Sequence, residues 1–251
     1  MVSFLEAIVL SIIQGITEWF PVSSSGHLAI AQNFFGFQDL SYDIFLHFAG
    51  MFAVVFLFKR EILKLLSFNK ESLNYIILLI IGMIPAGIVG FYFSDYIEKL
   101  FSNMFYLGVS FIFSGIIIYL TKFSKENKTE IGKKEAFFIG LMQAIAILPG
   151  VSRSGMTISG GLLRGISRRA SIKFSFLMSV PLILGASFLK AEDLLLSKIN
   201  LNILVVSFIL TFLVSLFTIK FLMKIIANDK FYLFGIYNIL LGILILISII
   251  I

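Results

Sequence analysis

Cysteine is absent from this chain of 251 residues, proline occurs only four times, and charged residues make up only 14% of it. Without cysteine the chain is not a small secreted scaffold held together by disulfides. Soluble domains carry about 25% charged residues, so such a low fraction excludes a water-soluble globular protein. Intrinsic disorder is excluded too, because disordered segments are polar and poor in large apolar side chains.

Apolar residues are abundant where charged residues are few. They make up 59% of the residues, with 29 phenylalanines among them, and the mean hydropathy is +1.03. A core of this size could not hide so much apolar surface from water. The apolar runs are continuous, whereas a β-barrel needs alternating segments of about ten residues. The composition therefore predicts an all-α polytopic membrane protein.

Six apolar stretches are long enough to cross a membrane, which takes about 20 residues. They cover approximately residues 41–58, 72–93, 103–121, 171–190, 200–220 and 231–251. Two further apolar regions, 3–36 and 134–166, are each interrupted by a cluster of Pro, Ser and Gly. A backbone at membrane depth can leave the helix only where protein or a wet cavity satisfies it. We therefore expect two re-entrant helix–loop–helix hairpins that enter and leave on the same side.

The basic residues orient this layout, because short cytoplasmic loops collect Lys and Arg. With re-entrant hairpins, sixteen of the twenty fall on one side: Lys59, Arg60, Lys64, Lys70, Lys122, Lys125, Lys128, Lys133, Lys134, Arg164, Arg168, Arg169, Lys173, Lys220, Lys224 and Lys230. Only Lys99, Lys190 and Lys198 lie on the other side, and Arg153 lies inside the second hairpin. This split predicts that both chain ends lie outside the cytoplasm. It also accounts for the net charge of +6, so no nucleic-acid partner is implied.

The N-terminal apolar stretch is not expected to be a signal peptide. Residues 1–19 lack a basic first segment and contain Glu6 and Glu18, which would be unusual in one.

The two interrupted regions are copies of each other. A shift of 129 positions aligns Gln14 with Gln143 and the string at 22–26, VSSSG, with VSRSG at 151–155. The chain is thus predicted to be a single membrane domain with two repeat halves, 1–121 and 134–251. Each half has one hairpin and three spans, and because three is odd the second half must be inverted. Inverted repeats with broken helices place their site where the two interruptions meet.

The two Ser/Gly clusters have the chemistry of an anion site. Ser23–Ser25 and Ser152–Ser154 each precede an expected helix start, where free N–H groups attract an anion. Gly26 and Gly155 would let a ligand approach the backbone closely. Arg153 can bind a phosphate through two donors at once.

A second group of residues suggests a cation and an acid–base catalyst. Gln14 and Glu18 lie four residues apart, on one helical face, and could together hold Mg²⁺ or Ca²⁺. His27 follows the first serine cluster and could act as a general base or acid. His47 lies in the first span, where we expect no polar partner beside it, so a structural role is expected for it. Glu6 is expected near the headgroups or water.

Each of these residues also has a structural interpretation. Ser and Gly inside membrane helices often serve packing, Arg153 and Glu18 could form a structural ion pair, and His27 could be an interhelical hydrogen-bonding residue. Ionisable groups at membrane depth are nevertheless functional by default, because isolation there is costly.

Two strings resemble the motifs of the undecaprenyl-diphosphatase family, which is linked to bacitracin resistance. Residues 14–27, QGITEWFPVSSSGH, resemble its (E/Q)-x-x-x-E and P-V-S-S-[ST]-G-H motifs, and residues 149–157, PGVSRSGMT, resemble its P-G-x-S-R-S-x-x-T motif. The length, the number of spans and the duplication fit as well. One departure is Gln14, where many members have Glu.

The resemblance implies a membrane phosphatase that converts undecaprenyl diphosphate to the monophosphate lipid carrier and inorganic phosphate, with Mg²⁺ or Ca²⁺ as cofactor. This recycles the carrier on the outer face of the cytoplasmic membrane for cell-envelope synthesis. By position, Glu18 and Gln14 would hold the metal or the diphosphate, and Arg153 would stabilise the transition state. Ser24, or a water activated by His27, would attack. The expected diphosphate-binding residues are Ser23, Ser25, Gly26, Ser152, Ser154, Gly155 and Thr157.

Two other functions compete with hydrolysis. A transporter or flippase for polyprenyl phosphates would also use inverted repeats and an anion site. It would not need a general base beside a cation, which favours the phosphatase. A purely structural membrane protein would leave Arg153 and the matched Ser/Gly clusters unexplained.

Overall fold

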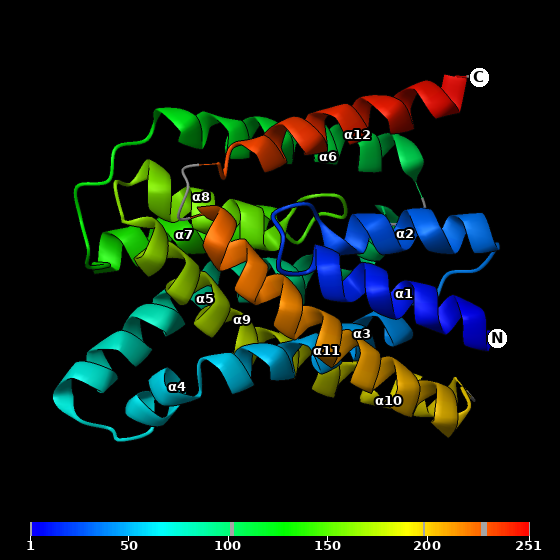
Figure 1. Cartoon of the computed structure of the whole chain (residues 1–251), viewed down its shortest axis with the longest axis horizontal. Helices are drawn as coiled ribbons and strands as arrows, with labels where there is room; N and C mark the ends of the chain where they lie inside the picture. The colour runs from blue at the N-terminus through cyan, green and yellow to red at the C-terminus, as the bar shows by residue number, and fades with distance from the viewer. Residues whose placement is uncertain (1, 101–102, 198, 227–229, 251) are drawn as a thin grey trace.

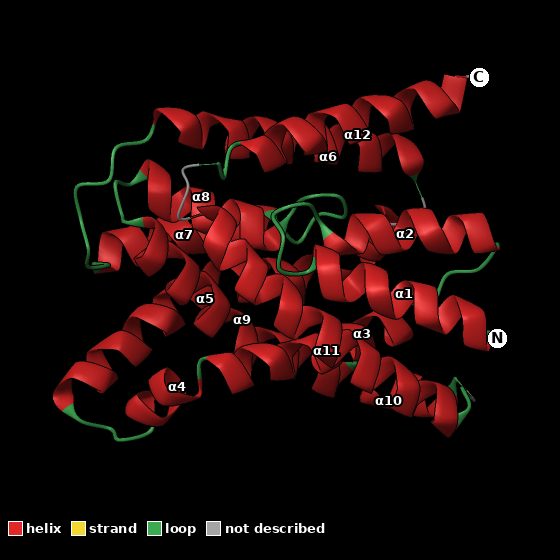
Figure 2. Cartoon of the chain, viewed as in Figure 1, coloured by secondary structure: helices red, strands yellow, loops and turns green. Residues whose placement is uncertain are grey.

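The computed structural model describes residues 2–100, 103–197, 199–226 and 230–250, and helices form nearly all of its regular structure. In chain order they are α1 (Phe4–Thr17), α2 (Ser24–Phe35), α3 (Leu40–Leu57), α4 (Lys59–Leu65), α5 (Lys70–Leu100), α6 (Met104–Leu120), η1 (Thr121–Phe123), α7 (Lys133–Ile145), α8 (Arg153–Leu163), α9 (Arg168–Leu189), α10 (Ala191–Leu196), α11 (Leu201–Ile226) and α12 (Leu233–Ile250). Figure 2 shows this all-helical architecture.

Six helices are long and apolar enough to cross a membrane, which confirms the six predicted spans. They are Leu40–Leu57, Lys70–Phe93, Met104–Phe123, Arg168–Leu189, Leu201–Ile225 and Leu233–Ile250. Many large apolar side chains on these helices remain exposed to the surroundings. A bilayer is the solvent in which such a surface is stable, so the protein is a multi-pass membrane protein.

The segments between the predicted spans are partly helical, and the first of them, 59–71, holds α4 and the start of α5. Helix α5 continues to Leu100 through the segment expected as a loop from Ser94, and α11 continues past Lys220 to Ile226. The segment 190–200 holds the short helix α10. The reason is that polar residues mark the end of an apolar run but do not end a helix; that takes Gly, Pro or a capping residue. Lys198, predicted on the outer side, lies outside the described residues.

The two interrupted regions form helical hairpins whose connecting loops meet inside the molecule. Helices α1 and α2 pack together, as do α7 and α8. In Figure 1 the first hairpin points inwards from the end where both termini lie, and the second points inwards from the opposite end. The Ser154 hydroxyl donates to the Phe20 carbonyl at 3.1 Å and so joins the two loops.

Helix positions in the two halves follow the same spacing. Helices α7, α8 and α12 begin at residues 133, 153 and 233, each 129 residues after α1, α2 and α6, which begin at residues 4, 24 and 104. The first helix of each half packs on a helix of the other half. Helix α1 packs on α11 of the second half, and its counterpart α7 packs on α5 of the first half.

Helices α6 and α12 form a closely packed pair along one edge of the molecule (Figure 1). Glycines allow this approach, since an added Cβ on Gly235 would lie 2.6 Å from the Gly115 carbonyl oxygen. The pair also supports the loops beneath it. The Asn238 amide of α12 donates to the Pro21 carbonyl at 2.9 Å, and the Ser114 hydroxyl of α6 accepts the Ser152 N–H at 3.2 Å.

The turns rich in basic residues lie at one end of the molecule. The α4–α5 turn, the segment between η1 and α7, and the α8–α9 turn all lie at the left of Figure 1, opposite both termini. The second and third are joined by backbone bonds, from the N–H groups of Asn127 and Lys128 to the Gly165 carbonyl at 2.9 Å, and by the Arg168–Glu126 ion pair.

Candidate active site

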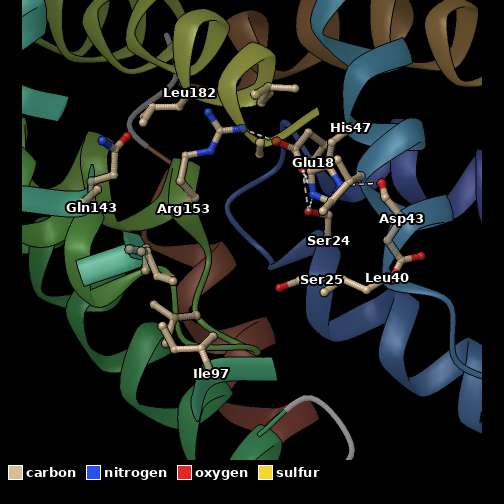
Figure 3. Close-up of a pocket in the computed structure, with 18 of the residues that line it drawn as sticks. Glu18, Ser24, Ser25, Leu40, Asp43, His47, Ile97, Gln143, Arg153 and Leu182 are labelled. Carbon is tan, nitrogen blue, oxygen red and sulfur yellow. Dashed lines mark hydrogen bonds and ion pairs between the residues drawn. The ribbon is translucent and has the colours of Figure 1, made fainter. Parts of the chain in front are cut away.

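A cavity of about 420 Å³ opens where the two loops meet. Its described lining includes Glu18, Ser24, Ser25, Ser152 and Arg153, which were predicted from the sequence, and four polar residues that were not assigned to the site: Asp43, His47, Gln143 and Lys190. The remaining wall is apolar and comes mainly from α5 and α9. Figure 3 shows Glu18, Ser24, His47 and Arg153 facing one another beside this space.

Local backbone chemistry sets the start of α2 and α8. The Ser23 hydroxyl accepts the Gly26 N–H at 3.2 Å, and the Ser152 hydroxyl accepts the Gly155 N–H at 3.0 Å. These are N-caps, which satisfy N–H groups that a helix start leaves unpaired. Ser23 does so at a φ of 67°, a conformation that costs a non-glycine residue free energy and that surrounding contacts must hold. Each cap presents the next residue, Ser24 or Arg153, to the cavity.

Glu18 is the centre of the polar cluster. It follows the last residue of α1 and is only 5% exposed. The Ser24 hydroxyl donates to its Oε2 at 2.5 Å, and the Gln14 amide donates to the same oxygen at 3.2 Å. The guanidinium of Arg153 forms an ion pair with its Oε1. A carboxylate and an arginine from opposite halves of the chain thus meet beside a serine hydroxyl.

His47 belongs to this cluster, and the expectation that it lacks polar neighbours is wrong. Its Nε2 lies 3.1 Å from Glu18 Oε2 and 3.3 Å from Ser24 Oγ, while its Nδ1 lies 2.7 Å from the Asp43 carbonyl. A carbonyl only accepts, so Nδ1 carries a proton and Nε2 faces Glu18 and Ser24. The four-residue spacing of Asp43 and His47 within a span was the sequence signal, since ionisable groups at such depth are costly.

His27 faces away from this cluster. The Ser23 carbonyl and the Tyr237 hydroxyl each lie 2.7 Å from one of its ring nitrogens, and the residue is not among those that line the cavity. A base acts within hydrogen-bond reach of the proton that it takes, and this geometry does not provide that reach. The ring instead holds the Ser23 carbonyl against α12.

Several predicted contact residues lie behind the cavity wall. Added Cβ atoms on Gly26 and Gly155 would lie 2.5 Å from Phe111 and 2.6 Å from Ile118, both in α6, so these glycines serve close packing rather than ligand approach. Thr157 is fully buried and bonds to the Arg153 carbonyl at 2.8 Å and to Ser175 at 2.6 Å. Gln14 is also fully buried behind Glu18.

The cluster can therefore perform three operations. It can bind an anion through Arg153 and the hydroxyls of Ser25 and Ser152, present the Ser24 hydroxyl as a nucleophile, and accept the serine proton at Glu18. The apolar walls of α5 and α9 beside it suit a ligand with a polar head and an apolar tail.

Comparison with known proteins agrees with this geometry. A family model described as bacitracin resistance protein BacA matches residues 7–244. Curated relatives named undecaprenyl-diphosphatase include one from Carboxydothermus hydrogenoformans, 37% identical over 96% of each chain. Another, from Methanococcus vannielii, is 41% identical over 93% of this chain and 95% of its own. A third, from Bacteroides thetaiotaomicron, is 38% identical over 98% of this chain and 99% of its own.

Proposed function

This chain belongs to the family of the bacitracin resistance protein BacA, and on that premise we propose that its central cavity hydrolyses undecaprenyl diphosphate. The protein is a membrane phosphatase that releases inorganic phosphate and returns the monophosphate lipid carrier to cell-envelope synthesis, which confers bacitracin resistance. The observation that carries the assignment is the Ser24–Glu18–Arg153 cluster at the head of an apolar cavity. A binding site for transport alone would not require a serine hydroxyl bonded to a buried carboxylate.

Ser24 is the nucleophile of the reaction and Glu18 is its base. The oxygen of Ser24 forms a bond to the terminal phosphorus, the bridging P–O bond breaks, and the serine proton passes to Glu18 Oε2, 2.5 Å away. Polyprenyl monophosphate leaves as an anion. Glu18 loses the serine proton to solvent, and water then attacks the phosphoserine while its proton passes to Glu18. The bond from phosphorus to the Ser24 oxygen breaks, Glu18 returns that proton to the serine oxygen, and inorganic phosphate is released.

Arg153 stabilises the charge on the phosphoryl group that is transferred. Its guanidinium reaches the cavity from the first turn of α8 and lies over the Trp19 ring, 5.9 Å from the ring centroid. The planar guanidinium can donate two hydrogen bonds to phosphate oxygens at once. Fixed charge in a low-dielectric site is usually the largest contribution to stabilising a charged transition state. Ser25 and Ser152 line the same space and supply hydroxyls to the diphosphate.

The surrounding residues position this machinery. Gln14 and His47 both contact Glu18 Oε2 and hold the carboxylate against Ser24. His27 and Ser23 hold the loop that presents Ser24, and Ser154 and Thr157 hold the loop and helix that present Arg153. Gly26 and Gly155 let both helix starts approach α6.

A divalent cation, Mg²⁺ or Ca²⁺, fits this site only together with the substrate. Among the described residues no group of three or more His, Cys, Asp or Glu side chains is arranged to hold a metal. Of the two carboxyl residues in the lining, Asp43 is bonded to Gln32 and Glu18 contacts Ser24. Mg²⁺ is often held by one or two carboxylates with substrate phosphates and water. Gln14 Oε1 has no hydrogen-bond partner within the described chain, but Gln14 lies behind the wall. Glu18 is thus the protein ligand that we propose, and the ion would neutralise diphosphate charge.

The topology completes the proposal. The equal helix spacing in both halves and the opposed hairpins support an inverted repeat of halves 1–121 and 134–251, with α1–α2 and α7–α8 as re-entrant hairpins. The basic turns would face the cytoplasm under the positive-inside rule. The termini and the cavity mouth would then face the outer side of the cytoplasmic membrane.

One experiment tests the function. Purified protein in detergent should release phosphate from a polyprenyl diphosphate, and EDTA should abolish the release. Ser24→Ala should retain substrate binding but lose turnover, and the wild type should yield a phosphoserine at position 24 when quenched during turnover. No release by the wild type at any Mg²⁺ or Ca²⁺ concentration would refute the phosphatase assignment. Release by Ser24→Ala at the wild-type rate would assign the attack to water.

A further inference from the structure

Gln143 is a buried polar residue of the cavity wall that the reaction described above leaves unused. It lies in α7, is only 2% exposed, and lines the cavity. Within the described residues its Nε2 makes one long bond, 3.4 Å to the Gly82 carbonyl, and its Oε1 has no hydrogen-bond partner. An unpaired polar group in a buried position costs stability. Such a group in a cavity wall indicates a ligand that pairs with it.

The repeat shows how the surroundings of Gln143 differ from those of its counterpart in the first half. Gln143 lies 129 residues after Gln14, whose amide donates to Glu18 at 3.2 Å. The residue that corresponds to Glu18 in the second half is Ile147, which also lines the cavity. The second half therefore has the glutamine without the carboxylate that occupies it in the first half. The Nε2 of Gln143 bonds to the Gly82 carbonyl instead, and its Oε1 has no partner within the described residues.

The cavity has two dissimilar walls. Figure 3 shows Glu18, Ser24, His47 and Asp43 on one side and Gln143 on the other, with Arg153 on Gln143's side and its guanidinium directed towards Glu18. The side with Gln143 continues into apolar residues of α5 and α9, including Ala86, Gly90, Leu182, Ile183 and Ala186. A prenyl diphosphate that places its terminal phosphate at Ser24 and its tail along α5 and α9 brings its lipid-linked phosphate past Gln143.

We propose that Gln143 binds the lipid-linked phosphate of the substrate and thereby determines which phosphorus faces Ser24. This inference rests on the proposed function. The unpaired Oε1 of Gln143 accepts one hydrogen of a water in the headgroup's hydration shell, and that water donates its other hydrogen to a non-bridging oxygen of the phosphate. Gln143 is a binding and positioning residue, because it does not touch the phosphorus that is attacked.

The two products of the reaction can test the two phosphate positions one at a time. Binding of a prenyl monophosphate, which has only the lipid-linked phosphate, and of inorganic phosphate is measured by calorimetry in detergent for the wild type and Gln143→Leu. We expect Gln143→Leu to bind prenyl monophosphate about tenfold more weakly, the loss expected for one water-mediated hydrogen bond to a charged group, and inorganic phosphate with unchanged affinity. Equal weakening of both ligands, or of neither, would overturn the proposal.

Stability gives a second, independent readout. If the Gln143 amide is unpaired without ligand, leucine removes a buried unsatisfied group and the Tm of Gln143→Leu should rise. A lower Tm with unchanged monophosphate binding would mean that the amide is structural. Should the leucine variant not fold, Gln143→Ala is compared by the same two binding constants.

A matched control comes from the adjacent residue. Met142 is 7% exposed, packs on Val151 and Met156, and is not among the cavity-lining residues, so Met142→Leu should bind both ligands as the wild type does. None of these measurements needs turnover. If the wild type releases no phosphate from prenyl diphosphate but Gln143→Leu still discriminates between the two ligands, the proposed function fails and the phosphate position stands.

Discussion

At the scale of single residues, the site depends on charges that compensate each other across the two halves. Glu18 comes from the first loop and Arg153 from the start of α8, and their ion pair is largely buried. Removing one member of a buried pair leaves the other uncompensated, which is strongly destabilising. A neutral substitution of Glu18 or Arg153 therefore lowers both stability and activity, and the two effects are hard to separate. A variant that keeps the charge tests catalysis more directly.

Arg153→Lys is such a variant. It keeps the positive charge but loses the planar fork that binds two phosphate oxygens at once. We expect kcat to fall on the order of 10²-fold, the cost of losing a positioned transition-state donor, while the protein stays folded. The matched control is Arg169→Lys at the exposed start of α9, which should have wild-type kcat. A kcat for Arg153→Lys within a few-fold of the wild type would contradict the role of the guanidinium.

At the scale of elements, α5 and α9 decide what the cavity accepts. Both contain an internal proline, Pro85 and Pro181, and proline interrupts helical hydrogen bonding and bends a helix. Their small residues leave room beside the polar cluster. We therefore expect the prenyl tail to lie along these helices.

Two glycines of α5 test the tail path. Gly90 lines the cavity and Gly87 does not, and an added Cβ would meet nothing within 3.8 Å at either position. Gly90→Leu fills the space and should lower kcat/KM for a prenyl diphosphate by at least about tenfold, whereas Gly87→Leu should leave it nearly unchanged. Steady-state kinetics on both variants gives the two values of kcat/KM. Equal losses of kcat/KM in the two variants would mean that the tail lies elsewhere.

The α6–α12 pair is the other element on which the site depends, because it holds both loops. Gly235→Ala places a methyl group 2.6 Å from the Gly115 carbonyl, and such overpacking costs about 1–3 kcal/mol. We expect a lower Tm for this variant. Gly185→Ala in α9 has open space around the new Cβ and should raise the Tm slightly, because alanine favours the helix. A Gly235→Ala protein as stable as the wild type would show that the helix pair can separate without cost.

At the scale of the whole molecule, the arrangement brings a loop from each end to a common site. The turns that carry the basic residues gather at one end of the molecule and both termini lie at the other (Figure 1). Each loop alone holds half of the chemistry, the hydroxyl and carboxylate in one and the guanidinium in the other. The activity is therefore a property of the assembled halves.

Orientation in the membrane can be measured directly, because the native chain has no cysteine. A single cysteine replacing Lys128 at the basic end should resist an impermeant thiol reagent added to intact cells, since the positive-inside rule places that end in the cytoplasm. A cysteine replacing the exposed Glu192 of α10 at the opposite end should react. The reverse labelling pattern would invert the proposed topology.

Much of this protein follows from local sequence. The six spans depend only on the length of apolar runs, and the two hairpins depend on Ser caps and Pro/Gly interruptions that act within a few residues. The repeat offset pairs the two Ser/Gly clusters that contain Ser24 and Arg153, and the four-residue spacing from Gln14 indicates Glu18. These features could be predicted because each arises from neighbours in the chain.

Tertiary packing decided the rest. His27 follows a serine cluster and His47 lies in an apolar span, yet the fold places His47 beside Glu18 and turns His27 towards Tyr237. The sequence around Gly26 and Gly155 predicts ligand approach, but side chains of α6 occupy the space beside both glycines. The position of Gln143 in the cavity wall, with its Oε1 unpaired among the described residues, also follows from the packing of α7. Sequence by itself determined the elements and the kind of chemistry; which side chains share the cavity was decided only in three dimensions, because contacts between distant segments depend on how the helices pack.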